Sequence, residues 1–455
     1  MTVPTRPVRE GDVIPLREAT RAWFAISLQT FGGPAGQIAV MQHKLVDEKR
    51  WIGQRRFLHA LNYCTLLPGP EAQQLAIYTG WLLNGTRGGL IAGGLFVVPG
   101  MVALLVLSAI YVSAGSTDFV TGLFTGLAPA VIAIVVQAVY RVGKRALNHR
   151  LLVGVAVASF LALTVFGVPF PVVVIAAGVA GWAFGRIVPE LGTVKPHDPA
   201  ADGPAPLISD DALHQDRPSA ARTVRVAAIG LVLWFAPVAA AAVLFSPDSV
   251  FVDQGLFFSG AAVVTFGGAY AVLAYVAHQA VDVFGWLAPG EMVRGLALAE
   301  TTPGPLIMVV QFVAFIGAYR DPGPLDPWAA AIVASLLVTW VTFVPCFLFV
   351  LLGAPYVERL RHIRHLTAAL TGITAAVVGV IAYLAVFFAL HNLFDATRSL
   401  QWGPIGLDVP VLSSWDPTAF AITATALALI FWRGWTPLRT LGACAALGLA
   451  VTLLT

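Results

Sequence analysis

The sequence Thr30-Phe31-Gly32-Gly33 occurs again as Thr265-Phe266-Gly267-Gly268, and Pro68-Gly69-Pro70 occurs again as Pro303-Gly304-Pro305. A single shift of 235 residues superimposes both pairs, and the residues between them align without a gap. Rare residue types inside this stretch coincide as well: His43 with His278, Asp47 with Asp282 and Trp51 with Trp286. The chain therefore contains an internal duplication, and each copy places glycine and proline inside apolar segments.

The composition indicates a protein that lies in a lipid bilayer. Hydrophobic residues make up 58% of the sequence and charged residues 11%, whereas soluble proteins average about 25% charged residues. Four uncharged runs are long enough for the ~20 residues that a membrane crossing needs: Gly88–Ser116, Val226–Phe245, Pro327–Gly353 and Leu366–Leu390. These features predict an all-α polytopic membrane protein.

The remaining composition argues against several other classes of function. The net charge is only +3, and Lys and Arg lie at the flanks of apolar runs, so we expect no nucleic-acid partner. Cys64, Cys346 and Cys444 lie within apolar segments and lack the spacing of metal ligands, so we expect no metal site and no cofactor. We find no combination of nucleophile, base and metal ligands that is typical of an enzyme.

The duplication divides the chain into five expected parts. They are an N-terminal tail at 1–16, a first repeat at 17–187, a cytoplasmic linker at 188–225, a linking transmembrane helix at 226–250 and a second repeat at 251–455. Beyond the motifs, a shift of 246 residues aligns Pro99 with Pro345 and Gly126 with Gly372. The two repeats therefore correspond over most of their length.

The distribution of cations predicts that the repeats have opposite orientations. Arg141, Lys144, Arg145 and Arg150 follow one apolar segment, whereas the equivalent loop after Leu390 carries several aspartates. Conversely, the loop near residue 115 has no cation, while its equivalent near residue 360 carries three arginines. Because Lys and Arg mark cytoplasmic loops, equivalent loops fall on opposite sides of the membrane. The chain is thus predicted to consist of two inverted-topology repeats.

The repeated motifs predict interrupted helices. Proline has no amide donor and glycine relaxes the backbone, so Pro-Gly-Pro cannot continue a helix. We expect Trp23–Val40 and Leu58–Leu83 to enter and leave the membrane on one side, broken at Gly-Gly and at Pro-Gly-Pro. Non-helical backbone at that depth must be buried in protein or line an aqueous cavity. Tilted full crossings are the alternative.

Such breaks are suited to binding an anion. A helix that begins after a break presents a positive end and free N–H groups, and both attract anions. Breaks that converge near the midplane would suit a tetrahedral oxyanion, and polar side chains beside them add donors. The alternatives are simple kinks, close packing and hydrogen bonds between helices. The predicted substrate-binding residues are Gly32, Gly33, Gln37, Gly69, Gln73, Gln74, Gly267, Gly268, Thr301, Thr302 and Gly304.

Four further residues are predicted to couple or gate transport. Glu71 directly follows one Pro-Gly-Pro, and Glu300 precedes the other by three residues. Acids at membrane depth are usually functional, and beside an anion they must be protonated or paired. The alternatives are a favourable place in a first helical turn for Glu71 and a salt bridge for Glu300. His43 and Asp47 share a helix face, which favours gating or pairing at a helix end over metal binding.

The motifs closely resemble those of the chromate ion transporter family. The resemblance rests on Phe31-Gly32-Gly33-Pro34, and on Leu67-Pro68-Gly69-Pro70 followed by Gln74-Leu75 and Tyr78-Thr79-Gly80. The second copy resembles the second domain of two-domain members, except that Ala269 replaces the proline after Gly-Gly. The resemblance covers nearly the whole chain. It implies a carrier in the cell inner membrane that exports chromate from the cytoplasm and confers chromate resistance.

Other transport activities are compatible with the same motifs. Chromate resembles sulfate in shape and charge, so an importer or exchanger of sulfate or another oxyanion is the main alternative. An anion channel and a membrane-embedded enzyme are weaker alternatives. The lipid bilayer is an expected partner, and a homodimer is left open.

Overall fold

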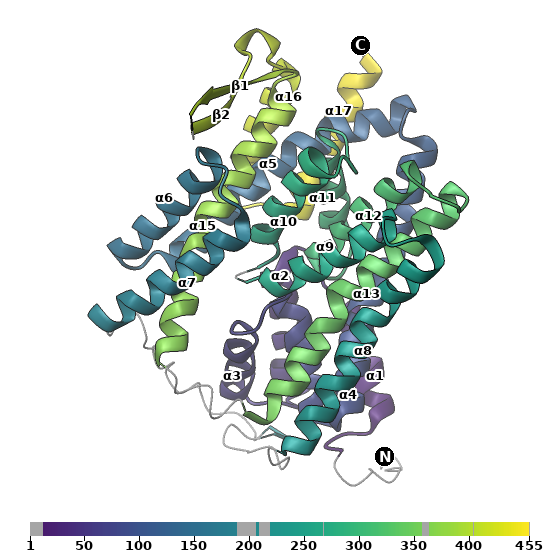
Figure 1. Cartoon of the computed structure of the whole chain (residues 1–455), viewed down its shortest axis with the longest axis vertical. Helices are drawn as coiled ribbons and strands as arrows, with labels where there is room; N and C mark the ends of the chain where they lie inside the picture. The colour runs from purple at the N-terminus through teal and green to yellow at the C-terminus, as the bar shows by residue number, and fades with distance from the viewer. Residues whose placement is uncertain are drawn as a thin grey trace.

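The computed structural model describes residues 12–188, 206–208, 219–266, 268–356, 364–403 and 405–454, which form the bundle of helices in Figure 1. Seven of the described helices are long and apolar enough to cross a membrane, and four shorter apolar helices accompany them. The single sheet within these ranges is an antiparallel hairpin of β1 (Thr397–Trp402) and β2 (Ile405–Pro410). The predicted all-α polytopic membrane class is confirmed.

The order of helices is nearly the same in the two halves of the chain. The first half contains α1 (Leu16–Ser27), α2 (Gly33–Gln42), α3 (Gln54–Cys64), α4 (Glu71–Ala114), α5 (Asp118–Ala146), α6 (Arg150–Thr164) and α7 (Phe170–Ile187). The helix α8 (Ala220–Phe245) follows. The second half contains α9 (Val250–Val264), α10 (Ala269–His278), α11 (Glu291–Thr301), α12 (Val309–Arg320), α13 (Pro327–Gly353), α15 (Arg364–Leu393), α16 (Pro417–Phe431) and α17 (Pro437–Leu454).

The long helix α4 is really two helices joined by a sharp reversal. Asn84 and Gly85 have non-helical backbone angles, with φ of +58° at Gly85. Beyond this point the chain folds back, so that Gly80 lies against Gly88. The short piece, 71–83, and the long piece, 86–114, correspond to α12 and α13, which pack side by side in the second half. Among the described residues, each half thus has eight corresponding helical pieces.

All four predicted interruptions occur where the motifs place them. α1 ends before Thr30 and α2 begins at Gly33, while α3 ends before Pro68 and α4 begins at Glu71. In the second half, α9 and α10 flank the Gly-Gly motif, and α11 and a 3-10 turn, η4 (Leu306–Met308), flank the Pro-Gly-Pro motif. Glycine is required at these breaks because the described glycines have positive φ: Gly32, Gly33, Gly69, Gly268 and Gly304.

One long helix of each half packs against helices of the other half. α5 packs along α16 and α17 of the second half, and α15 packs along α6 and α7 of the first half. The equivalent glycines Gly126 and Gly372 sit in these interfaces. Gly126 lies against the Cys444 carbonyl, and Gly372 against the Ala177 carbonyl. The interfaces are therefore exchanged between the halves in a reciprocal way.

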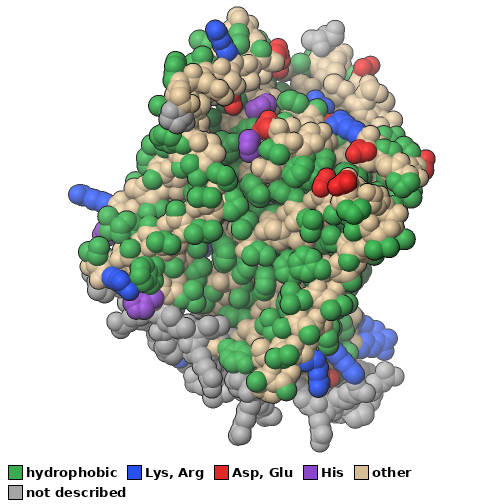
Figure 2. Space-filling view, in the orientation of Figure 1, with side chains coloured by type: hydrophobic (Ala, Val, Ile, Leu, Met, Phe, Trp, Pro, Cys, Tyr) green, Lys and Arg blue, Asp and Glu red, His purple; other side chains and the backbone are tan. Residues whose placement is uncertain are grey.

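Charged side chains are distributed unevenly along the bundle. Figure 2 shows carboxylates mainly over the upper part of the visible face and a group of Lys and Arg side chains at the lower end. The hairpin of β1 and β2 lies in the upper part of Figure 1, and the Gly406 N–H donates to the Val165 carbonyl of the α6–α7 turn over 2.8 Å. This hairpin was not predicted from the sequence; its strands are only six residues long and are mostly exposed.

Parts of the expected tail and linker pack against the helices. The Asn84 amide donates to the Ile14 carbonyl over 2.6 Å, so the N-terminal tail is hydrogen-bonded to the reversal in α4. Ile208 is buried and forms a parallel bridge with Ile52, with the Gly53 N–H donating to its carbonyl over 3.1 Å. α8 begins at Ala220, inside the segment expected to be linker. Residues 1–11, 189–205 and 209–218 lie outside the described ranges.

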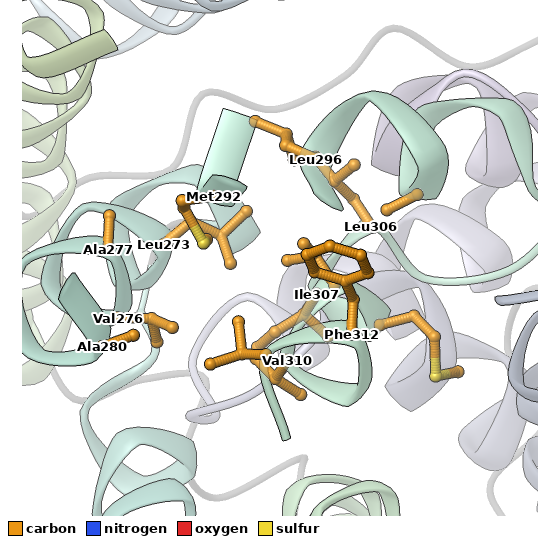
Figure 3. Packing of buried hydrophobic residues seen from close by; sticks show 14 of the residues in the cluster. Leu273, Val276, Ala277, Ala280, Met292, Leu296, Leu306, Ile307, Val310 and Phe312 are labelled. Atoms are coloured by element: carbon orange, nitrogen blue, oxygen red, sulfur yellow. The ribbon is translucent and has the colours of Figure 1, made fainter. Parts of the chain in front are cut away.

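Apolar packing fixes the helices that end at the breaks. Figure 3 shows Leu273 of α10, Met292 and Leu296 of α11 and Phe312 of α12 in one buried cluster. The Phe312 ring also lies against Gly295, where a side chain would collide with it. Close packing of this kind resists changes in volume, so the breaks are held in a rigid framework.

We expect the substitution Gly126→Ala to destabilise the protein by about 1–3 kcal/mol, because the added methyl group overlaps the Cys444 carbonyl. Gly154→Ala in α6 is the matched control, since a side chain there meets no heavy atom within 4 Å. Thermal unfolding of the purified protein in detergent measures both effects. Equal melting temperatures for the two variants would contradict the packing described for α5 and α17.

Candidate functional site at the helix breaks

Backbone hydrogen bonds join the four breaks in two pairs across the halves. The Gly69 N–H donates to the Thr265 carbonyl over 2.7 Å, and the Gly304 N–H donates to the Thr30 carbonyl over 3.0 Å. The shift of 235 residues converts one bond into the other. Each Pro-Gly-Pro break is therefore fixed to the Gly-Gly break of the opposite half.

Two predicted site residues reinforce these junctions. Gln37 of α2 donates from Nε2 to the Gly304 carbonyl over 2.5 Å, so the first half also holds the second half's break through a side chain. Gln74 donates from Nε2 to the Pro68 carbonyl over 2.6 Å, within its own break. Both glutamines are buried. Their amide nitrogens hold the backbone in this conformation.

The Pro-Gly-Pro breaks are tightly packed. A side chain at Gly69 would collide with the Cys346 sulfur of α13, and a side chain at Gly100 of α4 would collide with the Pro303 carbonyl. Gly100 and Cys346 are equivalent under the shift of 246 residues and follow the helix-internal prolines Pro99 and Pro345. Each Pro-Gly-Pro break thus lies against the kinked long helix of the other half.

The Gly-Gly breaks have space beside them. A side chain built at Gly32, Gly33 or Gly268 would meet no heavy atom within 4 Å. These glycines precede the first turns of α2 and α10, where N–H groups have no partner within the helix. Gly267 lies outside the described residues. The open side of the site is therefore at the Gly-Gly motifs.

Gln73 is the polar side chain that most clearly lacks a partner. It is fully buried in the first turn of α4, and neither of its amide atoms has a hydrogen-bond partner among the described residues. A buried amide without partners costs about 1–3 kcal/mol. Thr301 and Thr302 differ, because each hydroxyl donates to a carbonyl of its own helix, at 2.7 Å and 2.9 Å. Gln73 therefore has free donor and acceptor atoms for a ligand, whereas the hydroxyl hydrogens of Thr301 and Thr302 are already used.

Glu300 is buried and has a partner that the sequence analysis missed. The Tyr270 hydroxyl of α10 donates to Glu300 Oε1 over 2.5 Å. Arg141 of α5 adds an attractive electrostatic interaction with the Glu300 carboxylate. The acid at the end of α11 is thus held by one helix of its own half and by a cation of the other half.

Glu71 has a similar arrangement with a different cation. It is half-buried in the first turn of α4, where a carboxylate favours the positive helix end. Arg145 attracts it electrostatically. Arg141 and Arg145 are four residues apart on α5, so they share a helix face. One face of α5 therefore carries a cation that attracts an acid beside each Pro-Gly-Pro break.

The two acids are not duplicated. The shift of 235 residues places Thr65 opposite Glu300 and Leu306 opposite Glu71. Tyr270 likewise falls on Ala35. The halves share the breaks but differ in the ionisable groups beside them.

The His–Asp pairs form as their spacing predicts. His43 Nδ1 lies 3.5 Å from Asp47 Oδ2, and His278 Nδ1 lies 2.8 Å from Asp282 Oδ2. Both pairs are exposed and sit where α2 and α10 continue into π-helical segments, η1 (His43–Glu48) and η3 (Gln279–Val283). No group of three potential metal ligands occurs in the part of the chain that the structure describes. The pairs thus lie at the ends of α2 and α10 that are remote in sequence from the Gly-Gly motifs.

Arg141, Arg145 and Tyr270 were not predicted to belong to the site. The arginines carried a signal, because they form a cluster with Lys144, but the charge pattern was interpreted as topology alone. Tyr270 follows Gly-Gly by two residues and carried no signal, because its partner Glu300 is 30 residues away.

We expect Tyr270→Phe to destabilise the protein by about 1–3 kcal/mol, because it leaves the buried Glu300 carboxyl group without its hydroxyl donor. Tyr275→Phe on the same helix is the control, since the Tyr275 hydroxyl has no hydrogen-bond partner among the described residues. Thermal unfolding in detergent is the measurement. Adding Glu300→Gln to Tyr270→Phe should restore part of the loss; a loss equal to that of the control would show that the bond contributes nothing.

Comparisons with known proteins agree with this architecture. A family model described as Chromate transporter matches residues 17–182 and 252–449. A chromate transport protein of Pseudomonas aeruginosa is 32% identical over 368 residues, which cover 79% of this chain and 77% of the relative. A chromate transport protein of Cupriavidus metallidurans is 26% identical over 401 residues, covering 88% of this chain and 89% of the relative.

A shorter relative matches only part of the chain. An uncharacterized transporter of Bacillus subtilis is 28% identical over 173 residues, which cover 37% of this chain but 96% of the relative. No solved structure gives a significant match. The family model covers well over half of the sequence, in one segment of each half. This chain therefore belongs to the chromate transporter family.

Proposed function

We propose that this chain exports chromate from the cytoplasm across the cell inner membrane and thereby confers chromate resistance. The substrate would pass through an oxyanion site at the paired helix breaks. The observation that carries the proposal is the reciprocal pair of hydrogen bonds from Gly69 to Thr265 and from Gly304 to Thr30. The names of the full-length relatives support chromate as the substrate.

The proposal includes two inverted-topology repeats, at 17–187 and 251–455. Exchanging the halves converts each break-to-break bond into the other, and it also exchanges the α5–α17 interface with the α15–α7 interface. A two-fold relation between the halves accounts for both exchanges. The crossing α8 between them supplies the change of side that the cation pattern requires.

The chemistry of the breaks suits a tetrahedral dianion. The open space beside Gly32, Gly33 and Gly268 lies at the starts of α2 and α10, where helix ends carry a partial positive charge. The unpaired amide of Gln73 supplies a donor close to the Pro-Gly-Pro break. Gln37, Gln74, Gly69 and Gly304 keep the breaks in place rather than bind chromate directly.

In this proposal, Glu71 and Glu300 couple chromate transport to protons. Glu71 and Glu300 attract the cations of α5 that an anionic substrate also attracts. A bound dianion therefore competes with the carboxylates, and protonation of a carboxylate favours the substrate. Export of a dianion from a negative interior gains about 2.3 kcal/mol per charge per 100 mV, so coupling to protons adjusts transport without being required for it.

Membrane vesicles test the direction and the substrate. Everted vesicles that contain the chain, with the cytoplasmic face outward, should accumulate chromate faster than vesicles without it, and faster still with a positive interior. Sulfate in excess should compete, because it has the same shape and charge. Conductance without saturation would indicate a channel, and accumulation only in right-side-out vesicles would indicate an importer. Either result would contradict the proposal.

We expect Gln73→Leu to reduce chromate transport about tenfold or more, the loss of one good hydrogen bond to a charged ligand. The same change should leave the melting temperature unchanged or raise it, because it removes a buried amide without partners. Gln254→Leu is the control: Gln254 is also fully buried but donates to the Ala314 carbonyl, away from the breaks. The site assignment fails if Gln73→Leu transports at the native rate with native expression.

A further inference from the structure

A cationic pocket lies between the C-terminal part of α5 and the end of α16. Its volume is about 590 Å³, and it is lined by Gln137, Tyr140, Arg141, Lys144, Arg145 and Phe431 among others. The rings of Tyr140 and Phe431 meet edge to face with centroids 5.9 Å apart. The pocket thus has an apolar rim and a wall of three cations.

The three cations of this wall are not neutralised by direct partners. None of Arg141, Lys144 and Arg145 makes a salt bridge or a side-chain hydrogen bond with another described residue. All three side chains belong to exposed residues, so their donor groups reach the pocket and its solvent. Three cations that lack direct partners around one pocket attract anions.

The same arginines link the pocket to the breaks. Arg141 interacts electrostatically with Glu300 at the end of α11, and Arg145 with Glu71 at the start of α4. Glu71 directly follows one Pro-Gly-Pro motif, and Glu300 precedes the other by three residues. The wall of the pocket therefore has the outside solution on one side and the two acids of the candidate site on the other.

We infer that this pocket is an oxyanion-binding vestibule, in which Arg141, Lys144 and Arg145 hold a tetrahedral dianion before it reaches the helix breaks. The inference rests on the proposed transport of chromate and adds a second binding position to it. The cations lie in the region that the positive-inside rule assigns to the cytoplasm. The vestibule is thus on the side from which an exporter loads its substrate.

A lipid phosphate has the same chemistry as a free oxyanion, and the turn after α16 carries features of a membrane interface. Trp432 is exposed there, and Arg433 follows it. Arg141 and Arg145 also interact electrostatically with Glu300 and Glu71, which lie beside the proposed transport site. This favours a free anion over a lipid phosphate, because only a transported anion would go on to that site. The experiment separates the two sources.

Equilibrium binding of labelled chromate to the purified full-length chain tests the inference. The protein is placed in nanodiscs of neutral lipid, and the measurement is repeated with phosphatidylglycerol. We expect Arg141→Gln and Arg145→Gln to raise the Kd for chromate about tenfold or more, the loss of one charged hydrogen bond each. Lys144→Gln should raise it as well, and since Lys144 has no buried acid as partner, that variant tests the pocket without disturbing Glu71 or Glu300.

Arg150→Gln is the control, since Arg150 is a neighbouring cation at the start of α6 that does not line the pocket. Arg141→Lys, which keeps the charge but not the planar guanidinium group, should lose less affinity for chromate than Arg141→Gln. The vestibule is refuted if the native chain binds and transports chromate while all three glutamine variants bind it equally well. It is also refuted if these variants bind chromate like the native chain in neutral lipid and differ from it only in nanodiscs with phosphatidylglycerol, which would assign the pocket to lipid. Failure of the native chain to transport chromate would instead refute the proposed function.

Discussion

Backbone N–H and C=O groups at a helix break must find partners inside the protein, because lipid offers none. In this chain the breaks satisfy one another: Gly69 donates to Thr265, and Gly304 donates to Thr30. Neither half can complete its own breaks with the bonds of that half alone. The helices are exchanged in the same way: α5 of the first half packs against α17 of the second, and α15 of the second half packs against α7 of the first. The two halves therefore form one cooperative structure around the breaks.

This constraint explains the different character of the two kinds of break. The Pro-Gly-Pro motifs are packed against the kinked helices α4 and α13, and they act as fixed supports. The Gly-Gly motifs have space beside them and lie at the starts of helices, so they are where an anion can approach the backbone.

The breaks were predictable because they depend on local backbone chemistry: glycine allows positive φ and proline removes a donor. Even the reversal at Asn84 and Gly85 falls in the gap between Leu58–Leu83 and Gly88–Ser116. The partners were not predictable, because Tyr270 reaches Glu300 only after the chain has folded. The hydrogen bond from Gln37 to the Gly304 carbonyl was not predictable for the same reason, because Gly304 belongs to the other half of the chain. Periodicity and composition carry no information on such distant contacts.

Glu71 and Glu300 each occur in only one copy of the duplicated sequence. In a carrier built from inverted repeats, interchanging the conformations of the repeats turns the inward-open state into the outward-open state. Identical repeats would make these two states equal in free energy without a membrane voltage. In the proposed carrier, copies that carry different acids remove that degeneracy, so protonation as well as voltage would set its resting preference for one side of the membrane.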